Sequence, residues 1–388
     1  MPVRNRISEL VPEITEWRRD LHAHPELMFD THRTAGLVAE RLRDFGCDEV
    51  VEGIGRTGVV GVIEGQGPGR TVGLRADMDA LPIEERTGRD YASTEPGKMH
   101  ACGHDGHTAM LLGAARYLAE TRNFAGRVVV IFQPAEEGGA GGRFMCEDGL
   151  MERWGIEEVY GMHNWPGIPT GQFAIRPGPF FAASDDFEIV IEGRGGHAAK
   201  PHETVDSVLV ASHVVLALQS IAARNADPVE QCVVSVTTLD SSSKAFNVLP
   251  QRVTLRGTVR TLKPEVQDLA EARLTALAEQ TAAAYGAQAA VTYNRGYPVM
   301  ANHDAETEHA AEAARAVSGD CAEAPLVMGG EDFAFMLLER PGAYILVGNG
   351  DTAAVHSPDY DFSDEAIPAG TSWWAEIAER RLGPPARQ

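Results

Sequence analysis

The 388-residue sequence lacks several features that would define its class at once. No apolar run approaches the roughly 20 residues that a membrane-spanning helix needs, and the amino-terminal segment has no apolar core of the kind found in secretory signals. Basic side chains are scarce, with 34 Lys and Arg against 56 Asp and Glu, and the net charge is −22. This charge disfavours nucleic acids and anionic membranes as partners. We therefore expect a soluble cytoplasmic protein.

Cysteine is also scarce. The five cysteines are scattered, odd in number and show no framework spacing, which is typical of a reducing compartment. Cys102 differs from the others because it lies in "MHACGHDGHTAM", residues 99–110, with three histidines and an aspartate. A thiolate, imidazoles and carboxylates suit zinc, manganese, cobalt or nickel better than magnesium or calcium. A Cys-x-His spacing alone is a weak signal, so the rest of the chain must support it.

The order of apolar patterns predicts the architecture. Strands and helices alternate through the first 179 residues and again from 293, which favours an α/β domain with a mostly parallel sheet. Between 180 and 292 the order is β-α-β-β-α-β, the ferredoxin-like split motif. We predict one domain from 1–179 and 293–388, with an inserted α+β lid at 180–292.

Acids or histidines follow four predicted strands. The strands are "TVGLR", "RVVVIF", "EEVYGM" and "AYILVG", and open α/β sheets place their sites at such carboxyl ends. One carboxylate of an adjacent pair can bind metal while the other moves protons, as hydrolysis by a metal-activated water requires. We therefore predict that the 99–110 segment meets these side chains at one edge: Asp77, Asp79, Glu136, Glu137, His163 and His356.

Nine motifs in order give the sequence a resemblance to a known family. Together they resemble the metal-dependent amidohydrolases that include hippurate hydrolases, N-acyl-amino-acid amidohydrolases and auxin-conjugate hydrolases, within the aminoacylase and carboxypeptidase superfamily. The match runs from about Arg18 to Pro358. The motifs are "RRDLHAHPEL", "RADMDALP", "MHACGHDGHTAMLLGAA", "FQPAEEGG", "GMHNWP", "GRGGHAAKPH", "FNVLP", "RGTVR" and "MGGEDFAF".

The resemblance implies a zinc-peptidase-like catalytic domain with two divalent metal ions per subunit. Cys102 would bridge the ions, and the other ligands would be His104, Glu137, His163 and His356. Glu136 would be the general base that takes a proton from the metal-bridging water and returns it to the leaving amine. Asp79 would orient a ligand histidine. The metal role of Asp77 stays open, because the wider superfamily has His-x-Asp where this chain reads Asp77-Met78-Asp79.

The lid adds three candidates. His197 would stabilise the oxyanion, and the resemblance implies that it reaches the site of the partner subunit in a homodimer formed through the lid. Asn247 and Arg256 would bind the substrate, since a guanidinium is a natural partner for the free carboxylate of an acyl-amino acid. The structural alternatives are that His197 caps a turn of the lid and that Arg256 is a surface arginine on a strand.

The expected reaction is hydrolysis of the amide bond of N-acyl-L-amino acids, small molecules such as hippurate or N-acetyl-amino acids. Dipeptidase or carboxypeptidase cleavage is the nearest alternative, because it uses the same water and the same carboxylate clamp. Two other hypotheses are a thiol hydrolase with Cys102 as nucleophile and a non-catalytic ligand-binding protein with a structural metal. Both leave Glu136 without a role.

Overall fold

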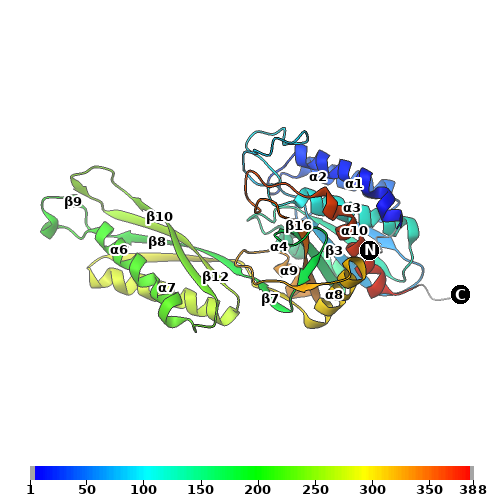
Figure 1. Ribbon diagram of the computed structural model, residues 1–388. Coiled ribbons are helices and arrows are strands. Elements are labelled where there is room, and N and C mark those ends of the chain that lie inside the picture. The colour runs from blue at the N-terminus through cyan, green and yellow to red at the C-terminus, as the bar shows by residue number, and fades with distance from the viewer. Residues whose placement is uncertain (1–4, 385–388) are drawn as a thin grey trace. The chain divides into compact units, whose positions relative to one another are not determined.

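The computed structural model describes residues 5–384, and their contacts divide into two compact units (Figure 1). Unit 1 contains the residues up to Gly178, Ala301–Pro325 and the residues from Asp332 onward. Unit 2 contains Pro179–Met300 and Leu326–Glu331. The first boundary between the units follows Gly178, close to the predicted boundary at 180. The second boundary follows Met300 and lies beyond the predicted boundary at 292. No pattern in the sequence indicated that residues 326–331 belong with unit 2.

Unit 1 is built on a mixed sheet of eight strands. The order is β1-β2-β4-β3-β5-β16-β6-β15, and β4, β3, β5 and β16 run parallel to one another. These four central strands are almost wholly buried, as their continuous apolar sequences predict. The bounds are β1 Glu49–Ile54, β2 Gly58–Glu64, β3 Thr71–Asp77, β4 Arg127–Gln133, β5 Glu158–Pro166, β6 Phe173–Ile175, β15 Ala322–Glu323 and β16 Gly342–Gly350.

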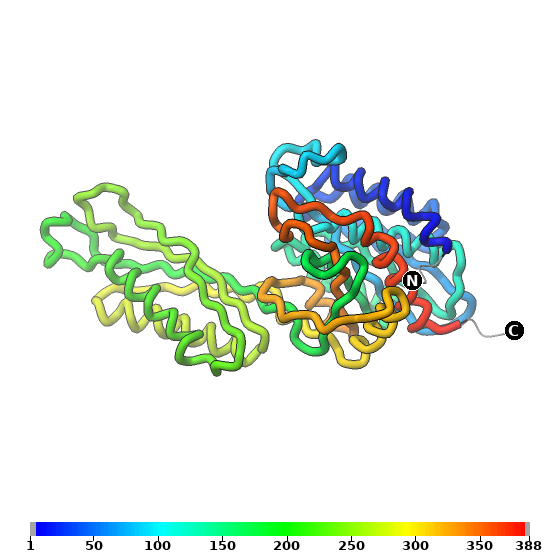
Figure 2. The backbone as a smooth tube through the Cα atoms, in the orientation of Figure 1, coloured from blue at the N-terminus to red at the C-terminus, as the bar shows by residue number. Residues whose placement is uncertain are grey.

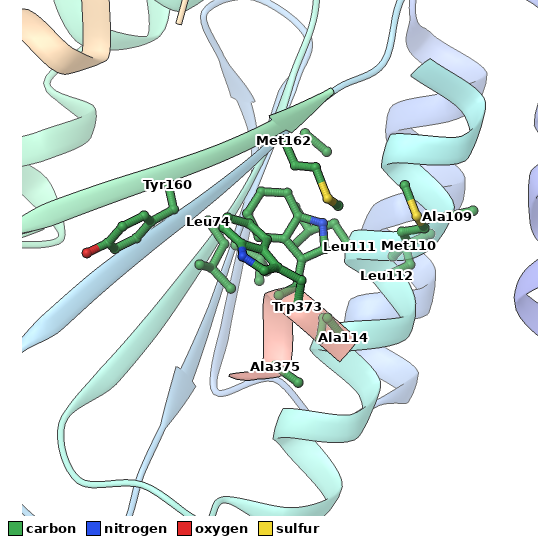
Figure 3. Packing of buried hydrophobic residues seen from close by; sticks show 14 of the residues in the cluster. Leu74, Ala109, Met110, Leu111, Leu112, Ala114, Tyr160, Met162, Trp373 and Ala375 are labelled. Atoms are coloured by element: carbon green, nitrogen blue, oxygen red, sulfur yellow. The ribbon is translucent and has the colours of Figure 1, made fainter. Parts of the chain in front are cut away.

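Helix α3, His104–Thr121, lies against this sheet and is covered in turn by α1 and α10. Its sequence is rich in alanine and glycine, so neighbouring helices approach closely: a Cβ added at Gly113 would lie 2.4 Å from Cδ1 of Ile14. In Figure 3, Trp373 of α10 packs near Met110 and Leu111 of α3 and Met162 of β5. This core fixes the amino-terminal end of α3 relative to the sheet. The helices are α1 Asn5–Ala23, α2 His32–Asp44, α4 Gly141–Glu147, α5 Leu150–Arg153, α8 Asp304–Ser318, α9 Ala334–Glu339, η3 Asp364–Ala366 and α10 Ile367–Leu382.

Unit 2 has a four-stranded antiparallel sheet in the order β10-β12-β8-β13. Buried residues alternate along β8, and helices α6 and α7 pack against the sheet (Figure 2). The main elements follow in the order β8 Ala183–Glu192, α6 Ser207–Leu218, β10 Cys232–Ser241, β12 Arg252–Thr261, α7 Pro264–Ala284 and β13 Gln288–Tyr297. Shorter elements of unit 2 are β9 Gly196–His197, η1 Pro201–Glu203, η2 Ile221–Asn225 and β11 Val248–Leu249. The boundaries between the units fall within β7 Gly178–Phe181 and β14 Met300–Asn302.

The expectation that no apolar segment reaches the length of a membrane span was wrong for one helix. By length and composition alone, Ser207–Asn225 could cross a membrane, with a mean hydropathy of 1.5. Val210, Val214 and Leu218 in this stretch pack into the core of unit 2. Core helices of water-soluble domains pass the same test, so one such helix is weak evidence for a membrane protein.

Candidate metal centre

The carboxyl ends of the central strands of unit 1 carry the predicted site residues. Asp77 ends β3, Glu136 and Glu137 follow β4, His163 lies on β5, and His356 follows β16. Because these strands are parallel, their carboxyl ends meet at one edge of the sheet. The amino-terminal end of α3 lies at the same edge, and there Sγ of Cys102 is 3.3 Å from Nε2 of His163.

The five predicted metal ligands form two groups that share one atom. Cys102, His104 and His163 offer ligand atoms within 4.8 Å of one another, and so do Cys102, Glu137 and His356. Sγ of Cys102 belongs to both groups. A pair of groups that share one thiolate is the arrangement that a bridging ligand requires in a dinuclear centre.

The unsatisfied polar atoms of the site fit metal ions. Both ring nitrogens of His104 and Oε1 of Glu137 are buried without a hydrogen-bond partner. Nε2 of His356 lies 3.2 Å from Oε1 of Glu137 without hydrogen-bond geometry. Buried polar groups in folded proteins nearly always have partners, so these unpartnered atoms fit the binding of a cation. Thiolate, imidazole and carboxylate donors together suit a divalent transition metal.

The electrostatics of the site also favour bound cations. Burial, Glu137 and Glu136 raise the pKa of the Cys102 thiol well above its usual value. Burial opposes a charge on His104, but the acids around it, chiefly Asp77 and Asp79, raise its pKa to about 10. Negative charge is therefore in excess around these side chains, and a divalent ion would neutralise it.

Asp79 holds the glutamate pair in place. Its Oδ1 accepts the backbone N–H of Glu136 at 2.9 Å, and its Oδ2 accepts that of Glu137 at 3.1 Å. Nδ1 of His104 lies 3.6 Å from Oδ1 of the same carboxylate.

The backbone is strained at two positions of the site. Ala135, which precedes Glu136, has a φ of 55°, and His356 has a φ of 64°.

His163 has the tautomer that a metal ligand needs. Its Nδ1 donates to the carbonyl oxygen of Asn164 at 2.5 Å, which leaves the lone pair of Nε2 facing Cys102. His107 is different, because its Nε2 accepts the backbone N–H and the Nδ2–H of Asn164, at 2.9 and 3.0 Å. Nδ1 of His107 donates to Oδ1 of Asp77 at 2.6 Å. His107 therefore has no ring nitrogen left for an ion.

Asp77 is likewise fully engaged by protein groups. Its Oδ2 accepts from Nη1 of Arg75 at 2.7 Å while its Oδ1 accepts from His107. Burial opposes ionisation, but His104, His107 and Arg75 lower the pKa of Asp77 well below its usual range. Asp77, His104 and His107 also offer ligand atoms within 4.8 Å of one another, but both carboxylate oxygens of Asp77 already accept hydrogen bonds, which favours a structural role beside the ligands.

A buried hydrogen-bond network that adjoins the site was not predicted from the sequence. Arg75 donates to Oε1 of Gln133 at 2.8 Å and to Oδ1 of Asp332 at 2.9 Å, and all three side chains are fully buried. Oδ2 of Asp332 also accepts the backbone N–H of Gly142 at 2.8 Å. A charged residue inside the buried strand "TVGLR" was the available signal, because charged side chains are rarely buried unless they are paired.

The three predicted lid residues lie in unit 2, and two of them are neighbours. His197 pairs with Val248 across β9 and β11, and the N–H of Ala198 donates to the carbonyl of Asn247 at 3.0 Å. Arg256 lies on β12, where it donates to Glu188 at 2.8 Å and to Asp240 at 3.3 Å. Arg256 is therefore an exposed strand residue that forms ion pairs with two acids of unit 2.

Known proteins resemble this chain over nearly its whole length. It is 40% identical over 380 residues to the hippurate hydrolase of Campylobacter jejuni, with 97% of this chain and 98% of the relative covered. It is 41% identical over 318 residues to the N-acyl-L-amino acid amidohydrolase of Geobacillus stearothermophilus, with 81% and 85% covered.

Solved structures agree with the sequence relatives. A crystal structure described as a dinuclear metal binding peptidase of the M20 family, from Bacillus subtilis, superposes with a TM-score of 0.85 at 34% identity and covers 97% of this chain and 99% of that chain. The sequence profile of Peptidase family M20/M25/M40 matches residues 73–380. These residues include every ligand of the candidate centre, and the chain belongs to the peptidase family M20/M25/M40.

Proposed function

We propose that this protein hydrolyses the amide bond of N-acyl-L-amino acids at a centre of two divalent metal ions. The observation that carries the proposal is the pair of ligand groups sharing Cys102, with the carboxylate of Glu136 beside them. His104 and His163 would complete one group, and Glu137 and His356 the other. The ions, when bound, lower the pKa of water and polarise the scissile carbonyl.

Glu136 is the proposed general base and acid. Its side chain is almost fully buried and lies within the same 4.8 Å group as His104 and Glu137. The carboxylate takes the proton of the attacking water and delivers it to the nitrogen of the leaving amine, so the amino acid leaves as a free amine and the acyl group as a carboxylic acid.

His197 is the proposed donor to the oxyanion. Its Nδ1 accepts the backbone N–H of Ala199 at 3.1 Å, so in the neutral ring the proton is on the exposed Nε2. Asn247, its neighbour, and Arg256 are the proposed substrate-binding residues. For Arg256 to bind a carboxylate, the substrate must displace or share the contacts with Glu188 and Asp240.

The proposed assembly is a homodimer formed through unit 2. Strand β10 is an edge strand with the apolar side chains of Val233 and Leu239 exposed. Leu209 and Leu216 of α6 are also exposed. Unpaired edges and exposed apolar side chains are features that a second copy of the chain would cover. Size-exclusion chromatography with light scattering would measure the mass, and a monomer at micromolar concentration would contradict this assembly.

The proposed location is the cytoplasm. All five cysteines are free thiols, and none is placed to form a disulfide. Proteins that work in an oxidising compartment more often pair such residues.

Carboxypeptidase activity is a second candidate, supported by one comparison. The chain is 40% identical over 351 residues to a protein named thermostable carboxypeptidase 1 from Saccharolobus solfataricus. The thiol hydrolase hypothesis is disfavoured. The pKa of Cys102 is raised, whereas a nucleophilic cysteine needs a lowered pKa.

The test measures metal content and activity together. The purified protein is assayed for zinc, manganese, cobalt and nickel, and for hydrolysis of hippurate, a panel of N-acetyl-amino acids and a panel of dipeptides, before and after chelation. About two ions per chain and a chelator-sensitive cleavage that added metal restores would support the proposal. A metal-free protein that still cleaves, or a metal-loaded protein inert on every amide, would overturn it. Preference for dipeptides would favour the second candidate.

A further inference from the structure

Tyr360 connects the loop that carries His356 to the rest of the centre. This tyrosine lies between β16 and η3, four residues after His356, and is fully buried. Its hydroxyl donates to Oδ1 of Asn164 at 2.6 Å. The ring and the hydroxyl therefore lie inside unit 1, although the side chain of His356 is 52% exposed.

Asn164 is the polar hub that receives this hydroxyl. Its Nδ2 donates to the carbonyl of Cys102 at 2.6 Å and to Nε2 of His107 at 3.0 Å. It also follows His163 directly, and its own carbonyl fixes the ring of that histidine. Asn164 therefore contacts the segments that carry Cys102 and His163. The hydroxyl of Tyr360 links Asn164 to the loop that carries His356.

The two ligand groups differ in how their residues are supported. His104 lies on α3 and His163 on β5, both within the packed core of unit 1. His356 lies on a loop, with a φ of 64°. Near this histidine three contacts hold the loop: its own N–H donates to the carbonyl of Ala101 at 2.7 Å, the N–H of Arg86 donates to the carbonyl of Pro358 at 2.8 Å, and the hydroxyl of Tyr360 donates to Asn164.

We propose that Tyr360, whose hydroxyl anchors the loop of His356 to Asn164, is a positioning residue that sets the affinity of the ion held by Cys102, Glu137 and His356. We expect the ion held by Cys102, His104 and His163 to be little affected by loss of the hydroxyl, because His104 lies on α3 and His163 on β5. The inference rests on the proposed two-ion function. Loss of a residue that orients metal ligands typically weakens metal binding by about 10–100-fold.

The test variant is Y360F, which keeps the ring and removes only the hydroxyl. Metal-stripped protein is titrated with Co²⁺, and calorimetry resolves the two binding steps. We expect one step to match the wild type and the other to weaken by about 10–100-fold. The matched control is Y160F. Tyr160 is also fully buried in unit 1, but its hydroxyl faces Glu158, at 3.4 Å, and both of its steps should match the wild type.

Two further variants assign the affected step. H356A should weaken the same step, and the double variant Y360F/H356A should bind no more weakly than H356A, because the hydroxyl acts through His356. N164D keeps an acceptor for Tyr360 but loses the donor to the Cys102 carbonyl, so both steps should weaken, since Cys102 serves both groups. N164D also tests the inference if Y360F fails to fold, as judged by circular dichroism.

The outcomes separate this inference from the proposed function. If the wild type binds fewer than two ions, the two-ion proposal fails and the inference fails with it. If the wild type binds two ions but Y360F weakens both steps equally, or neither, the inference alone is overturned. An N164D variant that loses only one step would also contradict it.

Discussion

The carboxylate of Asp79 accepts the backbone N–H groups of two consecutive residues, Glu136 and Glu137, one on each oxygen. Asp79 is fully buried, and burial raises its pKa although His104 opposes the shift. One side chain from the end of β3 therefore sets the direction in which the loop after β4 presents both glutamates. The proposed base, Glu136, and the proposed ligand, Glu137, are therefore both held in place by Asp79.

We predict that D79N weakens both catalysis and metal binding. An asparagine keeps one oxygen for one N–H but points an NH₂ group at the other, so the loop must shift. We expect a loss of about 10–100-fold in metal affinity or kcat. The control is D148N, because Asp148 also accepts a backbone N–H, that of Gly55 at 2.7 Å, but belongs to neither ligand group. Equal effects of the two variants on metal affinity would refute the special role of Asp79.

We predict that E136Q loses activity and keeps its metal. Glutamine has nearly the same shape but cannot take a proton, and a general base contributes about 10²–10⁴-fold to the rate. Inductively coupled plasma analysis should find wild-type metal content, and kcat should fall in that range. E147Q, on an exposed glutamate of α4, is the matched control. Retained activity in E136Q would remove Glu136 from the mechanism, and ligand binding without any turnover in the wild type would favour the binding-protein hypothesis.

The candidate site residues could be proposed from sequence patterns more readily than the residues that hold them in place. Asp79, Glu136 and His163 were predicted because acids and histidines follow strand ends, and parallel strands bring their carboxyl ends together. The predicted α/β class and its mostly parallel sheet are confirmed. They could be predicted because buried parallel strands have continuous apolar sequences.

The supporting residues could not be predicted in this way. Tyr360 lies far from Asn164 in the sequence, and a tyrosine between two aspartates gives no sign that its hydroxyl is buried against an amide. The pairing of Arg256 with Glu188 and Asp240 depends on strand register across β8, β12 and β10, and register is a tertiary property. The average hydropathy of the helix at Ser207–Asn225 was underestimated because polar residues interrupt the apolar run while its average remains apolar.

We predict that G103A is more damaging than an ordinary substitution in a left-handed turn. Gly103 has a φ of 85°, and an alanine there costs about 1–2 kcal/mol from backbone strain alone. Its Cβ would also lie 2.3 Å from Nδ2 of Asn164 and 2.5 Å from the hydroxyl of Tyr360. We expect a further loss of about 1–3 kcal/mol, because the buried hub must move.

The matched control for this prediction is G149A. Gly149 has a φ of 81°, and nothing lies within 4 Å of an added Cβ, so only the backbone cost applies. Urea unfolding of the two variants measures the difference, and Co²⁺ titration shows whether G103A also weakens metal binding. Equal free energies of unfolding for both variants would show that the hub accommodates a methyl group.

The last prediction concerns pH and a buried histidine outside the ligand groups. Nδ1 of His22 lies 2.9 Å from Oδ2 of Asp105, and its Nε2 lies 3.3 Å from Oε1 of Glu85. Burial opposes a charge on His22, but these two carboxylates outweigh it and raise its pKa to about 9. The other groups that face the ring are Arg18, whose Nη1 is 3.5 Å from Asp105, Tyr91 at 5.7 Å and His100 at 6.3 Å between ring centroids.

The sign of the effect follows from the direction of the shift. The folded-state pKa of about 9 lies above the ordinary value of 6.5, so protonated His22 stabilises the fold fully below about pH 6.5 and loses that contribution between 6.5 and 9. The contribution is on the order of 3 kcal/mol. Urea unfolding should therefore show a larger deficit for H22Q, relative to the wild type, at pH 6 than at pH 9.5. Asp105 keeps Arg18 as a partner in H22Q, so the variant should still fold. A deficit that does not change with pH would mean that His22 contributes by packing and hydrogen bonding, with no change of charge.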